Sequence, residues 1–276
     1  MCSVLQVSHS GYYVWRKRPP SKRKMANQRL LAEIKTIYKD NLEAYGSPRI
    51  TQALRRQGQR CGENRVARLM CLNGIQAKSS RRFQVTTRRN ATHPVAPNLL
   101  RRNFSAQRPN QIWLADITYI PTQEGWLYLA AVLDLYSRRI IGWAMDRRMT
   151  EQLTLDALHM AVQQRRPVRS LMHHSDQGGQ YTSQAYQDRL QAHAIQVSMN
   201  GVGAWYDNAP MESFFGSLKS ERVHHMAYRT RRQARSDLFA YIESFYNTRR
   251  LHSSLGYLSP VAFENVYLLD QGPRLS

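Results

Sequence analysis

The sequence is short of cysteine, of long apolar stretches and, in its first part, of acidic residues. Its 276 residues include three cysteines, Cys2, Cys61 and Cys71, whose spacing fits neither a disulfide framework nor a paired metal site. No apolar run approaches the length that crosses a bilayer, and the first residues lack the apolar core of a signal peptide. These absences predict a reduced, cytoplasmic protein without membrane contact.

Acidic residues are scarce in residues 1–110, which hold 23 of the 40 Lys and Arg but only 4 of the 19 Asp and Glu. The formal net charge of the whole chain is +21 at pH 7, far more than solubility requires. The asymmetry predicts that the first part of the chain holds a polyanion, with nucleic acid as the first candidate. A basic patch without nucleic-acid function is the alternative. Residues 111–276, where the two signs nearly balance, predict a more ordinary globular domain.

Residues 1–75 are predicted to form a small, all-helical module. Apolar residues recur at helical spacing in residues 26–39, and a second helix is expected to begin at the Ser47 cap. Gly58 ends that helix, and a third begins near Gly62. Two short helices joined by a glycine-containing turn are typical of a helix-turn-helix motif.

The polar face of the third helix is the candidate DNA-reading surface. Asn64, Arg65 and Arg68 share that face and would point into a DNA groove. A small helical bundle with a solvated basic face is the alternative. Aromatic and basic residues are interleaved in residues 10–20, and we interpret this segment as packing against a neighbouring helix, with base stacking as the alternative.

Residues 76–110 have little periodicity and predict a basic linker that follows phosphates. Its candidate DNA contacts are Arg81, Arg82, Arg88 and Arg89.

The pattern changes at residue 111, where β-prone apolar segments begin. Strands are predicted at residues 112–120, 126–135, 140–145, 170–173 and 195–199, and helices at 150–164, 183–192, 208–226 and 231–248. Three strands followed by alternating helices and strands predict an α/β domain with a mixed sheet covered by helices. We place this domain, with its C-terminal helices, at residues 111–262 and a tail at 263–276.

Three carboxylates in this domain are candidates for a metal site. Asp116 ends a strand-like run, Asp176 stands on a glycine turn, and Glu212 opens a helix, with 35 residues between Asp176 and Glu212. Such contexts allow convergence from three sides, and hard Mg²⁺ prefers carboxylate oxygens. Two ions held this way would activate a nucleophile and neutralise a leaving oxygen in phosphoryl transfer.

Each candidate has a simpler alternative role. Asp116 could have a buried partner, Asp176 could shape a turn, and Glu212 could complement the helix dipole. Asp134 is the main rival of Asp116, although a turn or ion-pair role suits its strand end better.

Four further polar residues near these carboxylates have two interpretations each. Asn208 either caps a helix or touches substrate, and Lys219, two turns after Glu212, either meets a phosphate or is simply exposed. His173 and His174 lack partners at zinc spacing, so we favour strand-end packing or support of the site for them.

Several motifs resemble one protein family. They are Ser10-Gly11-Tyr12-Tyr13, residues 45–50, residues 113–119, His174-Ser175-Asp176-Gln177-Gly178, residues 207–209 and 212–215, Lys219, Tyr246-Asn247 and Leu255-Gly256-Tyr257. Over nearly its whole length the chain is similar to OrfB-type transposases of bacterial insertion sequences, which have a retroviral-integrase-like DDE core.

The resemblance implies an RNase H-like, five-stranded mixed sheet flanked by helices. It assigns catalysis and metal binding to Asp116, Asp176 and Glu212, with two Mg²⁺ (or Mn²⁺), and adds Lys219 as a downstream basic residue. The implied reaction is 3′-end cleavage and strand transfer at element termini. Arg249 and Arg250, close to the last motif, are further candidate DNA contacts.

The implied partners are double-stranded DNA, as terminal inverted repeats and target, and further copies of the chain in a synaptic complex at the bacterial nucleoid. A fusion partner encoded by an upstream frame is also implied. Residues 201–205 depart from the pattern, which has a basic residue and Asn-Cys there. A DNA-binding regulator with a silent core and a general RNase H-like nuclease are the alternatives.

Overall fold

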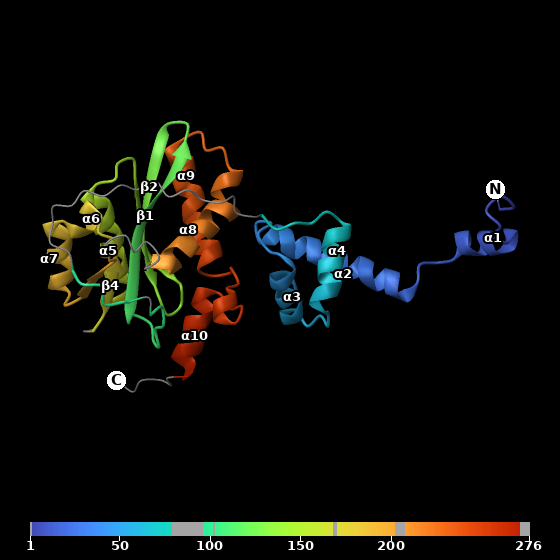
Figure 1. Cartoon of the computed structure of the whole chain (residues 1–276), viewed down its shortest axis with the longest axis horizontal. Coiled ribbons are helices and arrows are strands. Elements are labelled where there is room, and N and C mark those ends of the chain that lie inside the picture. Colours follow the sequence, from blue (N-terminus) through green and yellow to red (C-terminus); the bar gives the residue numbers. More distant parts are fainter. Residues whose placement is uncertain (1, 79–95, 102, 168–169, 202–207, 271–276) are drawn as a thin grey trace. The chain divides into compact units, whose positions relative to one another are not determined.

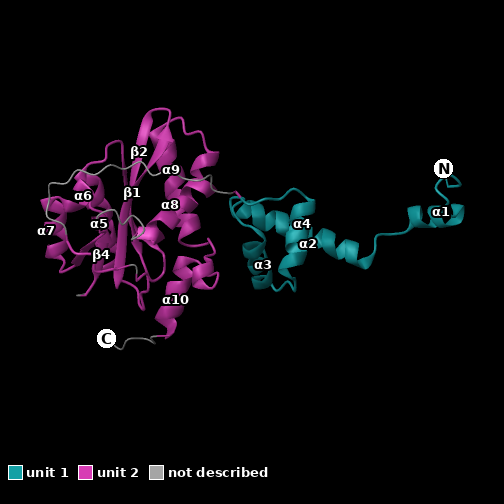
Figure 2. Ribbon diagram, viewed as in Figure 1, with its two compact units in different colours: residues 1–77 teal, residues 78–276 magenta. Residues whose placement is uncertain are grey.

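The computed structural model describes residues 2–78, 96–101, 103–167, 170–201 and 208–270, which form two compact units, residues 1–77 and 78–276 (Figure 2). Four predicted arginines, Arg81, Arg82, Arg88 and Arg89, and most of the atypical segment 201–205 lie outside the described residues. None of the helices described is both long and apolar enough to span a bilayer.

The first unit contains a three-helix bundle, as the apolar periodicity predicted. Its helices are α2 (Lys22–Asp40), α3 (Ser47–Arg56) and α4 (Glu63–Leu72). The residues that they bury together include Leu30, Ile34, Ile37, Ile50, Leu54, Val66, Leu69 and Met70. Gly58 has a φ of 84° between α3 and α4, in the left-handed region that favours glycine. Gly46, rather than Ser47, takes the cap position of α3.

Helix α1 (His9–Lys17) contradicts the packing predicted for the aromatic segment. The helix contains no buried residue, and Trp15 is 68% exposed. Its aromatic side chains therefore do not pack in the core of the described three-helix bundle.

The second unit is built on a five-stranded mixed sheet with strand order β3-β2-β1-β4-β5. Its elements are β1 (Ile112–Thr122), β2 (Gly125–Asp134), β3 (Ile140–Asp146), α5 (Glu151–Arg165), β4 (Met172–Ser175), α6 (Gly179–Thr182), α7 (Gln184–Ala192), β5 (Gln196–Met199), α8 (Ala209–Glu221), α9 (Arg231–Phe239), a π-helix (Ala240–Tyr246) and α10 (Pro260–Asp270). Strands β1 to β3 are antiparallel, whereas β1, β4 and β5 are parallel. Figure 1 shows α5 and α7 on one side of the sheet and α8 and α9 on the other. The predicted mixed sheet is confirmed.

Helix α5 packs tightly on β3 because Gly142 leaves room for it. A Cβ at Gly142 would lie 2.3 Å from the carbonyl oxygen of Ala157 and 2.7 Å from the Cβ of Ala161. The neighbouring Trp143 points the other way, where its indole N–H donates to Glu243 at 2.7 Å. Adjacent residues of β3 thus serve opposite faces of the sheet.

The Gly142→Ala variant is expected to lose about 1–3 kcal/mol of unfolding free energy, because the helix must move away from the sheet. Gly216→Ala is the matched control, because no atom lies within 4 Å of a Cβ built there. Alanine also has a higher helix propensity than glycine inside α8. Urea unfolding of both variants measures the difference. An unchanged midpoint for Gly142→Ala would contradict the tight packing.

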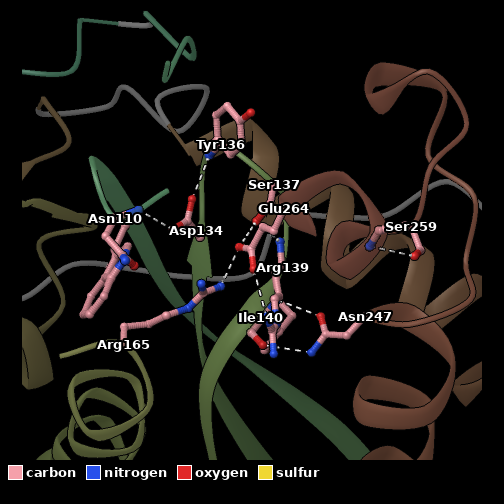
Figure 3. Close-up of polar contacts among 12 residues, drawn as sticks. Asn110, Asp134, Tyr136, Ser137, Arg139, Ile140, Arg165, Asn247, Ser259 and Glu264 are labelled. Atoms are coloured by element: carbon pink, nitrogen blue, oxygen red, sulfur yellow. Dashed lines mark hydrogen bonds and ion pairs between the residues drawn. The ribbon is translucent and has the colours of Figure 1, made fainter. Parts of the chain in front are cut away.

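The segment predicted as a tail begins with helix α10, which is anchored by Glu264 (Figure 3). This carboxylate is 3% exposed and accepts hydrogen bonds from Ser137 at 2.6 Å, Arg139 at 2.9 Å and Arg165 at 2.6 Å. Nearby, the amide of Asn247 pairs with both the N–H and the C=O of Ile140 at 2.9 Å. The C-terminal helices are therefore fastened to the sheet by buried polar contacts.

The described second half of the predicted linker packs against the sheet. The N–H of Leu99 donates to Ser198 Oγ at 3.0 Å, the N–H of Met199 donates to the carbonyl of Pro97 at 3.4 Å, and Leu100 is buried. Residues 96–101 thus belong to the second unit and extend the core beyond the predicted boundary at residue 111.

Candidate active site

Asp116 and Asp176 occupy matching positions on adjacent parallel strands. Strand β4 pairs with β1 over residues 112–114, and the last pair is Leu114 with His174. Each aspartate lies two residues beyond its member of that pair, on the first strand and just after the second. Neighbouring strands are about 4.8 Å apart, so this register brings the two carboxylates together.

Glu212 lies in the first turn of helix α8, and its charge acts on Asp116. The start of that helix is tied to the site by Asn208, whose side-chain amide donates to the carbonyl of Ala115 at 3.2 Å. Asn208 stands at the cap position but makes no side-chain capping hydrogen bond, so its predicted capping role is wrong. Its buried Oδ1 has no hydrogen-bond partner among the described residues and lies beside the residue that precedes Asp116.

The three carboxylates and Lys219 act on one another electrostatically. Burial, together with the negative charges of Asp176 and Glu212, raises the pKa of Asp116 to about 8, although the Ile117 N–H and Lys219 oppose the shift. Burial likewise raises the pKa of Asp176 and of Glu212, and the N–H of Gly178 opposes it at Asp176. The charges repel one another when no cation is present.

Lys219 is 7% exposed, so its alternative role as a solvated lysine is wrong. Its Nζ lies 4.7 Å from the ring centroid of Tyr119, an arrangement typical of a cation–π contact. Burial lowers its pKa, while the charge of Asp116 raises it.

Oxygen donors of this kind suit Mg²⁺ and not a soft metal. Among the described residues, however, no three His, Cys, Asp or Glu side chains are close enough to hold one metal ion. The carboxylates therefore interact without forming a closed ligand set, which fits their mutual repulsion.

Two buried histidines support the loop that carries Asp176. His174 Nε2 lies 2.6 Å from Asn200 Oδ1 and its Nδ1 lies 2.8 Å from Ser198 Oγ. The Gln177 amide donates to the carbonyl of Asn200 at 2.6 Å. His173 Nε2 meets the hydroxyl of Tyr186 at 3.0 Å. Both imidazoles serve packing and support, as we favoured from the sequence, and β5 fixes the position of the loop.

Asp134, the rival of Asp116, has the predicted turn role. Its carboxylate is fully buried and accepts from the backbone N–H groups of Asn110 at 2.7 Å and Tyr136 at 2.9 Å (Figure 3). Burial raises its pKa to about 6, and the hydrogen bond from Asn110 opposes the shift. Asp134 fixes the end of β2 and is not one of the carboxylates that act on Asp116.

Sequence reasoning missed Ser198 and Asn200 as supports of the site. The available signal was a polar residue, Ser198, inside an otherwise apolar strand end. Its burial against a histidine could not be predicted without the β4–β5 pairing, in which His174 stands opposite Ser198.

The predicted DNA contacts differ in how they are placed. Asn64, Arg65, Arg68 and Arg249 are exposed. Arg65 donates to Asn27 Oδ1 at 2.7 and 2.9 Å, and this contact holds its guanidinium beside α2. Arg250 is 4% exposed and binds Glu221 with two of its nitrogens, so we withdraw the prediction that it contacts DNA.

The pKa of Asp116 predicts how stability varies with pH when metal is removed with EDTA. The folded protein binds this proton more tightly than the unfolded chain, so folding stability should fall as pH rises from about 4 to about 8. In Asp116→Asn that loss is absent, and the Tm of the variant should exceed that of the wild type by several degrees at pH 8 but not at pH 4.

The exposed Asp188 provides the control, because Asp188→Asn should change Tm equally at both pH values. Thermal unfolding across this pH range gives the comparison. If the difference in Tm between Asp116→Asn and the wild type is the same at every pH, the fold does not hold the Asp116 carboxyl in its protonated form.

Three sequence families match the chain. The model of "Integrase core domain" matches residues 106–204, a second "Integrase core domain" model matches 212–268, and "HTH-like domain" matches 25–83. The last match confirms the helix-turn-helix character of the first unit.

Curated relatives resemble the chain over nearly its whole length. The "Insertion element IS600 uncharacterized 31 kDa protein" of Shigella sonnei is 46% identical, over 97% of this chain and 98% of the relative. "Transposase InsF for insertion sequence IS3A" of Escherichia coli (strain K12) is 45% identical, over 96% of this chain and 93% of the relative. Among solved structures, a simian T-cell lymphotropic virus intasome in complex with PP2A regulatory subunit B56 gamma is 15% identical with a TM-score of 0.47, over 88% of this chain and 76% of that one.

Proposed function

The chain belongs to the insertion-element transposases that have an integrase core domain, and on this premise we propose that it cuts and joins DNA at the ends of such an element. The reaction is 3′-end cleavage followed by strand transfer. The observation that supports the site is the position of Asp116 and Asp176, each two residues beyond the last pair of β1 and β4. The negative charge of Glu212 raises the pKa of Asp116, and this interaction supports Glu212 as the third carboxylate of the site.

Asp116, Asp176 and Glu212 are proposed to hold two Mg²⁺ ions, for which Mn²⁺ substitutes. When bound, such ions activate the attacking oxygen and neutralise the leaving one. The chain itself positions these ligands through the His174–Asn200 contact and through Asn208. Lys219, buried beside Asp116, is placed to neutralise a phosphate of the bound strand.

DNA is proposed to bind the exposed polar face of α4, and DNA is also proposed to bind the core. Asn64, Arg65 and Arg68 would enter a groove, and the hydrogen bond to Asn27 would orient the Arg65 guanidinium. Further phosphate contacts are proposed for Arg81, Arg82, Arg88, Arg89, Asn208, Lys219 and Arg249. All but Asn208 are cations, which predicts strongly salt-dependent affinity.

The proposed partners are the terminal inverted repeats, the target DNA, and further copies of this chain in a synaptic complex. A fusion to the product of an upstream frame and a location at the nucleoid in the cytoplasm complete the proposal. The relatives' names associate them with insertion elements, and the positive charge of residues 1–110 supports a DNA partner.

Labelled DNA that carries the inverted repeats flanking the gene tests the function. With Mg²⁺, the protein should nick the 3′ ends of the repeats and join them to a second DNA, and a scrambled repeat should remain intact. Sequence-specific binding without nicking would favour the regulator, and equal cutting of scrambled DNA would favour the general nuclease.

A further inference from the structure

Two aromatic rings pair across the hairpin formed by β1 and β2. The ring centroids of Tyr119 and Trp126 lie 4.9 Å apart in an edge-to-face arrangement with an interplanar angle of 78°. Trp126 remains 49% exposed, although tryptophan is usually far more buried. The register pairs Trp126 with Pro121, so the indole stands close to the hairpin turn. One contact thus orients an indole that still faces solvent.

The aromatic pair is connected to the carboxylates through Lys219. The Lys219 ammonium lies over the ring of Tyr119, and its charge acts on Asp116. Asp116 and Tyr119 are three residues apart on β1, which is about 10 Å at the rise of a β-strand, and the alternation of side chains directs the two to opposite faces of the strand. Lys219 connects them, because it contacts the Tyr119 ring and its charge acts on Asp116. A DNA strand that leaves the carboxylates past Lys219 would therefore reach the aromatic pair after about three nucleotides at the spacing of stacked bases.

One arginine, Arg231, contacts the backbone of the exposed Trp126 and is itself bound to the carboxylate of Glu124, to which its backbone N–H donates at 2.8 Å. Arg231 Nε donates to the carbonyl oxygen of Trp126 at 3.0 Å. Gly125, with a φ of 103°, makes room for that arginine, because a Cβ there would lie 2.8 Å from its Nη2. Exposed arginines follow in and before α9, namely Arg229, Arg232 and Arg235. An exposed aromatic face next to Arg231, with further exposed arginines on the same helix, suits a nucleic acid strand better than an apolar protein surface.

We propose that Trp126, backed by Tyr119 and Lys219, is a stacking site for an unpaired base at the DNA end that lies in the active site. This inference rests on the proposed function, because it requires DNA at the carboxylates. Stacking uses the ring face that all bases share, so the site accepts any base. It holds an end whose terminal pairs have opened, and the cations neutralise the adjacent phosphates.

A DNA end with a three-nucleotide single-stranded overhang containing 2-aminopurine tests the site in Ca²⁺, which keeps the DNA intact. Stacking on Trp126 should quench the probe in the wild type and leave it fluorescent with Trp126→Ala. Affinity for the overhang should fall about tenfold, as expected for one lost stacked base, whereas affinity for a blunt duplex should change by less than about twofold.

Two variants control for folding and for general loss of aromatic surface. Trp126→Phe keeps a ring and should keep most of the quenching. Phe239→Ala removes another half-exposed aromatic ring of the core, one that packs on Trp143, and should bind both DNAs like the wild type.

Equal quenching by the wild type and Trp126→Ala would overturn the stacking site. An equal loss of affinity for blunt and overhang DNA would also overturn it, because Trp126 would then contact DNA in general. A change of oligomeric state would overturn it as well, because Trp126 would then contact another protein chain. Wild-type nicking in Mg²⁺ is measured in parallel. If the wild type cuts repeat ends and only the Trp126 result fails, this inference alone is wrong, whereas absent nicking counts against the proposed function.

Discussion

Asp116→Asn, Asp176→Asn and Glu212→Gln should each lower Mg²⁺-dependent cleavage of repeat-end DNA by at least about 10³-fold. The physical reason is that each change removes a charged oxygen ligand, and the metal ions contribute several kcal/mol at about 1.4 kcal/mol per factor of ten. The effect should be non-additive, so Asp116→Asn combined with Asp176→Asn should be little worse than either alone. Rates of 3′-end nicking on labelled DNA provide the measurement.

DNA affinity separates a catalytic role from loss of the fold. Each variant should bind repeat-end DNA at least as tightly as the wild type in EDTA, because a repulsive negative charge near the phosphates is gone. Asp188→Asn, at an exposed carboxylate on α7, should cut normally. If all three site variants still cut, the assignment is wrong. If only Glu212→Gln still cuts, the two aspartates act with another ligand.

Arg250→Ala should cost about 3–5 kcal/mol of unfolding free energy, because it leaves the carboxylate of Glu221 buried without its partner. Arg250 Nε donates to Glu221 at 2.8 Å and Nη2 donates to it at 2.5 Å, while the Tyr241 hydroxyl donates to the same carboxylate at 2.8 Å. Both charged residues are less than 5% exposed, so water cannot replace the lost contact. Urea unfolding measures the loss.

The neighbouring Arg249 is the matched control. It is exposed, so Arg249→Ala should change stability by less than about 0.5 kcal/mol while reducing the salt dependence of DNA binding. Replacing Arg250 by Met together with Glu221 by Leu should recover much of the stability, since no charge remains buried. A stable Arg250→Ala protein with weakened DNA binding would restore the original assignment of Arg250 as a DNA contact.

Periodicity predicted most of the fold, because local apolar spacing reports which face of an element is buried. The three bundled helices of the first unit and the succession of strands and helices along the second followed from it. The tail was mistaken because the role of Glu264 depends on Arg139 and Arg165, which are 125 and 99 residues away in sequence. Such long-range polar contacts leave no local pattern.

The members of the candidate site remain a prediction, and their geometry could not be read from the sequence. Residue type and context suggested Asp116 and Asp176, whereas Glu212 depended on the family resemblance. The proximity of the two aspartates depends on the register of β1 with β4, which alternation alone does not specify. Two adjacent arginines show in the same way that local sequence does not reveal which side chain is buried. Arg249 and Arg250 look equivalent in sequence, and only the packing of α8 against the C-terminal segment buries the second of them against Glu221.

The anchoring of α10 by Glu264 has a consequence for how the protein is made. Arg139 and Arg165 leave the ribosome about a hundred residues before their common partner, so both wait without their counter-charge during synthesis. The proposed catalytic carboxylates are all translated earlier than this glutamate. A nascent chain halted before residue 264 would thus carry all five strands and the complete set of proposed catalytic residues, but two arginines on the sheet side would lack their common carboxylate. Docking of α10 is therefore expected to be a late step in the folding of this unit.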